Sequence, residues 1–173
     1  AKVQGNSVDF LMPPLSPMEL TIGFLSGAVT RGILVGLVTY AAVWIMQITP
    51  FQIANLFAIV YFSVVASLFM GAVGLMGGIW ADKFDQLAAF QNFLILPLTM
   101  LSGVFYSIQS LPPVWQQVSH VNPFFFMIDG FRYGFFGQSD ASPWLSLGVV
   151  FICLTLLALA TLAMLSRGYK LRS

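Results

Sequence analysis

The chain has 173 residues, of which 58% are hydrophobic, 15% aromatic and only 8% charged, and its formal net charge is +1. A soluble domain carries roughly 25% charged residues, so this composition excludes a soluble enzyme and a disordered tail. The small net charge excludes a nucleic-acid binder, and the single cysteine excludes an internal disulfide framework. We therefore predict an integral membrane protein.

The first segment is polar and then rich in proline, and we expect it to begin inside a cytoplasmic loop of a longer protein. Ser16 can cap a helix, Pro17 suits its first turn, and Glu19 favours the positive end of its dipole. Two interpretations stay open, a loop on the membrane surface and a proline-stiffened surface that docks a soluble partner. The candidate docking residues are Pro13, Pro14, Leu15, Ser16, Pro17, Met18 and Glu19.

Long uncharged runs predict about four membrane-spanning helices, because a span needs about 20 apolar residues. The predicted spans are about 28–48, 52–80, 87–107 and 143–166. The Thr49-Pro50 pair separates the first two, since proline disfavours helix in the residue before it. The runs do not alternate with polar residues, as barrel strands would. The fold class is therefore an all-α polytopic bundle forming one domain, 1–173.

Glycine pairs four residues apart, at 23 and 27, 32 and 36, and 74 and 78, predict close helix packing in lipid. The third span carries the clearest polar side chains. They either line a translocation pathway or bond neighbouring helices, and both interpretations stay open. The candidate pathway residues are Gln91, Asn92, Thr99 and Tyr106.

The connection 108–143 is rich in proline and aromatic residues, and it predicts two short helices at about 113–120 and 123–135. Both are too short to span and too apolar for a solvated loop, so they should lie at the interface or re-enter the membrane. Asn122 and Pro123 start the second helix. Asp129 and Arg132 could pair on one of its faces, either as a partly buried pair or as an exposed pair of little value. His120 has no second histidine to form a metal site, and no catalytic arrangement of side chains is present.

The basic residues set the predicted orientation. Four spans place both chain ends on one side, together with six of the seven basic residues, whereas Arg132 lies on the other side. The positive-inside rule makes the side with six cytoplasmic.

Several segments together resemble a known family. They are Leu11-Met-Pro-Pro-Leu-Ser-Pro-Met-Glu-Leu, Gly103-Val-Phe-Tyr-Ser, Leu111-Pro-Pro-Val-Trp, Asn122-Pro123 and Gly130-Phe-Arg-Tyr-Gly134. In order and spacing they are similar to the membrane (permease) subunit of type-2 ATP-binding-cassette (ABC) exporters, from about residue 9 to the end. Members usually have six spans, and this chain resembles the last four.

The resemblance implies that residues about 10–22 form a short cytoplasmic coupling helix that contacts an ABC ATPase subunit. It also implies a homodimer or pseudo-dimer in a bacterial inner membrane. The implied function is outward movement of an amphiphilic cargo, which would be a drug, a lipid or a lipid-linked saccharide.

No Gly-x4-Gly-Lys-Ser/Thr loop is present, so we expect ATP to be bound and hydrolysed by the partner. For this chain itself we predict no enzyme activity, metal or cofactor. Two alternatives remain, an ion-coupled secondary transporter and a non-transporting membrane scaffold. The first would usually carry ionisable side chains within its spans.

Overall fold

The computed structural model describes residues 16–48, 52–104, 110 and 112–167, and these form helices without strands. Their bounds are α2 (Pro17–Ile45), α3 (Leu56–Trp80), α4 (Phe84–Phe90), α5 (Leu96–Met100), α6 (Pro113–Val121), α7 (Pro123–Phe136) and α8 (Pro143–Ser166). A π-helical turn, Gln91–Ile95, joins α4 to α5. The predicted all-α bundle is confirmed.

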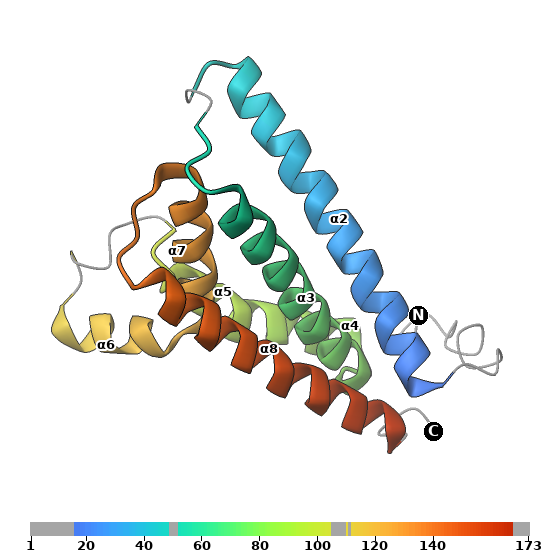
Figure 1. The fold of residues 1–173 in the computed structure, drawn as a ribbon. Coiled ribbons are helices and arrows are strands. Elements are labelled where there is room, and N and C mark those ends of the chain that lie inside the picture. The colour runs from blue at the N-terminus through green and yellow to red at the C-terminus, as the bar shows by residue number, and fades with distance from the viewer. Residues whose placement is uncertain (1–15, 49–51, 105–109, 111, 168–173) are drawn as a thin grey trace.

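Three helices of the described chain, α2, α3 and α8, are long and apolar enough to cross a membrane. α3 and α8 match the second and fourth predicted spans closely. α2 ends at Ile45, just before Gln47 takes a positive φ of 55° and the predicted break begins. Figure 1 shows α3 and α8 running antiparallel to α2, so that the start of α2 and the end of α8 lie at the same end of the bundle.

The third predicted span is a broken helix. α4, the π turn and α5 together cover 84–100, about 25 Å of helix against the roughly 30 Å of hydrocarbon. Part of the predicted outer end, 105–107, lies outside the described residues.

The core is an aromatic cluster where α3, α7 and α8 meet. Phe62 and Phe69 of α3 and Phe124 and Phe125 of α7 are buried around Val150 of α8. The rings of Phe69 and Phe124 meet edge to face with centroids 5.7 Å apart, an arrangement that adds to the gain from burial. The hydrophobic core therefore lies under α7 rather than along the full length of the bundle.

α7 packs along the N-terminal half of α3. It begins beside Phe69, about 20 Å along α3 from its first residue, and its Gly134 carbonyl accepts hydrogen bonds from the N–H groups of Ala54 and Asn55, just before α3 starts. This position fits the re-entrant alternative for α7, and its Phe124–Met127 segment is buried in protein. α6, by contrast, exposes Val114, Trp115, Val118 and Val121, as an interfacial helix would.

Candidate functional site

The start of α2 is a complete capping box. Ser16 Oγ accepts a hydrogen bond from the Glu19 N–H at 3.2 Å, and Glu19 Oε2 accepts one from the Ser16 N–H at 2.7 Å. These bonds satisfy donors that a helix start leaves unpaired. The Met18 side chain is left 60% exposed beside them. Of the other candidate docking residues, Pro17 is exposed in the first turn, and Pro13, Pro14 and Leu15 lie outside the described residues.

The expected short coupling helix, separate from a span starting at 28, is wrong for the described part of this segment. One uninterrupted helix of 29 residues runs from Pro17 to Ile45. Nothing between residues 22 and 28 stops it, because Gly23 and Gly27 each cost an α-helix only about 1 kcal/mol. At about 44 Å, α2 exceeds the hydrocarbon thickness by roughly 14 Å.

The glycine pairs behave differently from the prediction. A Cβ on Gly32 would fall 2.1 Å from Ser67 Oγ, which shows a close approach to α3. A Cβ on Gly23, Gly27, Gly36, Gly74 or Gly78 would meet nothing within 4 Å. Their spacing permits close approach, but within the described chain no neighbouring helix uses it.

The π turn follows from Pro97. Proline has no N–H to continue the helical bonding pattern, and the Leu96 N–H donates to the Gln91 carbonyl, five residues back. Gln91 and Asn92 are exposed on this irregular segment, and no hydrogen bond is found from either to another described helix. The Thr99 hydroxyl of α5 donates to the Ile95 carbonyl at the end of the π turn at 2.9 Å, and Tyr106 lies outside the described residues.

Asn122 joins α7 to α5. Its Oδ1 accepts the Phe124 N–H at 3.0 Å, which caps α7, and its Nδ2 donates to the Leu98 carbonyl at 2.6 Å. Asn122 is buried, and the Leu98 carbonyl is one of those that the last turn of a helix leaves unpaired. Pro123, in the first position of α7, needs no hydrogen bond there.

Replacing Asn122 with alanine should destabilise the fold by about 1–3 kcal/mol, since it removes a cap and leaves a carbonyl unpaired. Asn122→Ser keeps the capping oxygen but is too short to reach Leu98. It should therefore recover only the part of the lost stability that comes from capping α7. Equilibrium unfolding in mixed micelles measures both variants. Wild-type stability for Asn122→Ser would show that the Leu98 bond contributes nothing.

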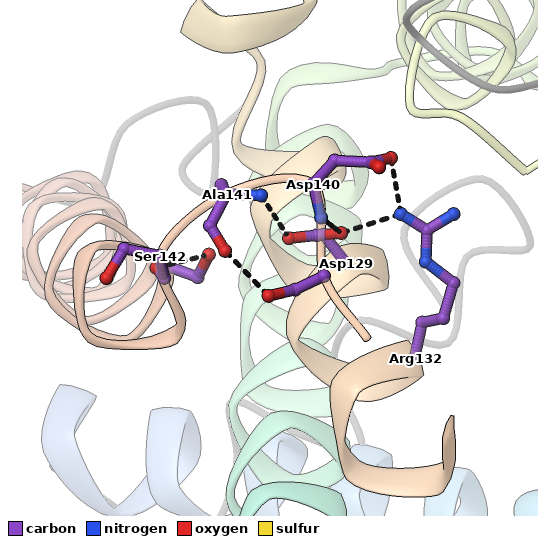
Figure 2. Close-up of polar contacts among 7 residues, drawn as sticks. Asp129, Arg132, Asp140, Ala141 and Ser142 are labelled. Carbon is purple, nitrogen blue, oxygen red and sulfur yellow. Dashed lines mark hydrogen bonds and ion pairs between the residues drawn. The ribbon is translucent and has the colours of Figure 1, made fainter. Parts of the chain in front are cut away.

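Asp129 is the centre of a polar network that fixes the α7–α8 connection (Figure 2). Its side chain is 1% exposed. It accepts hydrogen bonds from Arg132 Nη2 at 2.7 Å, from the Asp140 N–H at 2.8 Å and from the Ala141 N–H at 3.1 Å. Arg132 also pairs with the Asp140 carboxylate. The structure therefore places Asp129 and Arg132 as a pair that is buried on the aspartate side.

Arg132, whose side chain is 35% exposed, is held in its charged form by this network. Partial burial opposes the charge, but hydrogen bonds to Asp140 and Asp129 and the attraction of both carboxylates outweigh it and raise the pKa of the guanidinium. The network therefore links α7 to the start of α8 through ion pairs and hydrogen bonds.

Sequence reasoning missed Gly130 and Gly134 as packing residues. A Cβ on Gly130 would fall 2.1 Å from the Phe62 ring, and one on Gly134 would fall 2.6 Å from Ile59 Cγ1 and 2.9 Å from the Ile59 backbone nitrogen. The signal was present, because these two glycines are also four residues apart.

Comparison with known proteins gives a consistent result. A family model described as "ABC-2 type transporter" matches residues 1–136. The chain is 36% identical over 173 residues to the inner membrane transport permease YadH of Escherichia coli (strain K12), covering 100% of this chain and 67% of that protein. It is 26% identical over 157 residues to nodulation protein J of Rhizobium leguminosarum bv. viciae, covering 91% of this chain and 60% of that protein. No solved structure matches the chain.

Proposed function

Because this chain belongs to the ABC-2 type transporter family, we propose that it is the permease subunit of an ATP-driven exporter that moves an amphiphilic cargo out of the cytoplasm. The observation that carries the proposal is α2, one continuous helix that begins at an exposed cap and continues through a membrane-spanning length. A soluble partner that moves the start of such a helix also moves its membrane part.

The proposed docking point for an ABC ATPase subunit is the first turn of α2. Met18 offers an exposed apolar side chain there, and the capping box fixes the backbone beneath it. A pre-formed turn loses little entropy when it binds. ATP-driven closure of the partner would shift the permease only through contacts that differ between its two states, and this turn is suited to make them.

The proposed pathway face is the α4–α5 segment. Irregular backbone at membrane depth is tolerated only where it is buried in protein or lines a watery cavity. The π turn meets this condition if the exposed Gln91 and Asn92 face a pathway between two permease copies. A homodimer is therefore part of the proposal, with Thr99 and Tyr106 as further candidate lining residues.

The proposed orientation puts both chain ends in the cytoplasm of a bacterial inner membrane. The start of α2, the α3–α4 turn with Lys83 and the end of α8 with Arg167 lie at one end of the bundle (Figure 1). Arg132 belongs to the other end, where α7 meets the start of α3. This distribution supports the positive-inside orientation.

A matched pair of substitutions tests the docking point. Met18→Trp enlarges the exposed side chain at the start of α2, and Met46→Trp does the same at its opposite end, where Met46 is 69% exposed. We expect Met18→Trp to weaken binding of the ATPase subunit to the permease in nanodiscs at least about tenfold, which is about 1.4 kcal/mol. Met46→Trp should leave binding unchanged, because tryptophan is common at the outer interface.

The Glu19→Gln variant distinguishes the charge of Glu19 from its role in the capping box. The glutamine oxygen can still accept a hydrogen bond from the Ser16 N–H, so the first turn of α2 should stay folded although the charge is lost. Equal binding by Met18→Trp and the wild type would contradict docking at this turn.

A further inference from the structure

A cavity of about 320 Å³ opens at the outer end of the bundle, between α3, α7 and α8. Five aromatic side chains line it, namely Phe57, Tyr61, Phe62, Tyr133 and Trp144. Phe62 is buried, whereas Phe57 and Trp144 are exposed, Trp144 to 81%. The site lies in the first turns of α3 and α8, which is the depth of lipid headgroups if both helices cross the membrane from there.

Three of the lining rings contact one another around Tyr61. The Tyr61 hydroxyl donates a hydrogen bond to the Leu147 carbonyl of α8 at 3.1 Å. The Tyr61 ring stacks on Phe57 with centroids 6.1 Å apart and meets Phe62 edge to face at 5.2 Å. The Tyr61 side of the cavity is therefore pre-formed, because Tyr61 is held by Leu147 and by its contacts with Phe57 and Phe62.

The charges around the cavity favour a cation over an anion. None of the described residues that line it is charged; its polar members are neutral, among them Asn55 and Ser139. Next to Ser139 and Tyr133 lies the network in which two carboxylates, of Asp129 and Asp140, share the single guanidinium of Arg132. That cluster carries one more negative than positive charge, and none of the described residues that line the cavity adds a cation.

We propose that this outer cavity binds the ammonium headgroup of a membrane phospholipid, with Phe57, Tyr61 and Trp144 as the aromatic faces on which the ammonium rests. Ammonium groups are attracted to the faces of aromatic rings, and tryptophan gives the strongest interaction. A lipid is the ligand present at this depth, and the bound headgroup would link the outer ends of α3, α7 and α8. The site is independent of ATPase docking, so each proposal can fail without the other.

The test uses the complete permease in nanodiscs made of equal amounts of phosphatidylethanolamine and phosphatidylglycerol. After gentle extraction, the lipids that stay bound are quantified by mass spectrometry. The wild type should retain phosphatidylethanolamine in preference to phosphatidylglycerol, and Trp144→Ala and Phe57→Ala should each lower that preference about 2- to 5-fold. The matched controls Trp115→Ala and Phe136→Ala remove exposed rings outside the cavity and should retain the wild-type preference.

A second arm needs no variant. Tetramethylammonium chloride should displace phosphatidylethanolamine from the wild type more effectively than sodium chloride at the same concentration. Three results would each overturn the proposal. They are equal displacement of phosphatidylethanolamine by the two salts, retention of phosphatidylglycerol equal to that of phosphatidylethanolamine, and a loss of the lipid preference in the control variants equal to that in the cavity variants.

Discussion

Replacing Asp129 with alanine is expected to destabilise the fold by about 3–5 kcal/mol, the largest effect of any single substitution considered for this chain. The change removes a carboxylate that is 1% exposed and that accepts hydrogen bonds from Arg132 and from the N–H groups of Asp140 and Ala141. Two backbone donors and a partly buried guanidinium then lose a partner. Equilibrium unfolding in mixed micelles gives the free energy directly.

Two variants show whether the loss comes from the network. Asp129→Asn keeps an oxygen acceptor in the same position, so it should lose less stability than alanine. Asp85→Ala removes an exposed aspartate from the first turn of α4 and should cost less than about 1 kcal/mol. If Asp129→Ala cost no more than Asp85→Ala, the α7–α8 connection would not depend on this network.

The Gly134→Ala variant is expected to lose about 1–3 kcal/mol by overpacking. The added Cβ would lie 2.9 Å from the Ile59 backbone nitrogen, and backbone cannot rotate away as a flexible side chain can. α7 would have to move away from α3, which would stretch the hydrogen bonds from the Ala54 and Asn55 N–H groups to the Gly134 carbonyl. Thermal unfolding in detergent, followed by size-exclusion chromatography, measures the loss.

Gly148 of α8 is the matched control. A Cβ there would meet nothing within 4 Å, so Gly148→Ala should be neutral or should stabilise the helix by up to about 1 kcal/mol. Unfolding of Gly134→Ala at the same temperature as Gly148→Ala would contradict the close contact between α7 and α3.

Local signals predicted much of the fold. Ser16 and Glu19 marked the start of α2 because capping depends on a few adjacent residues. Pro143 and the uncharged run after it marked α8, since hydropathy alone defines a span. These features need no information about distant parts of the chain.

Features that depend on tertiary contacts were harder to predict. The coupling segment and the first span merged into α2 because no breaker separates them, and sequence shows where a helix can stop but not where it must. The glycine pairs were ambiguous because their spacing does not show whether another helix lies against them. Gly74 and Gly78 have the same spacing as Gly130 and Gly134, but only the second of these two pairs meets a close neighbour.

The candidate sites also combine features that local sequence predicts with features that depend on tertiary contacts. The pairing of Asp129 with Arg132 follows from their spacing on one helix, but the third partner, Asp140, comes from the loop after α7. Asn122 was predicted as part of an outer helix start, whereas its bond to Leu98 joins segments that are distant in sequence. The aromatic cavity combines three helices, so no local pattern indicates it.

Site-specific cross-linking in membranes tests most directly whether an ABC ATPase subunit drives this permease through the start of α2. Cys153, the only cysteine, is first replaced with alanine, and single cysteines are then placed by Met18→Cys or Met46→Cys. A short bifunctional reagent should link position 18 to the ATPase subunit, with a yield that changes when ATP is bound, and should not link position 46. A link from position 46 in place of position 18, or none from position 18 in a complex that still hydrolyses ATP, would contradict that mechanism.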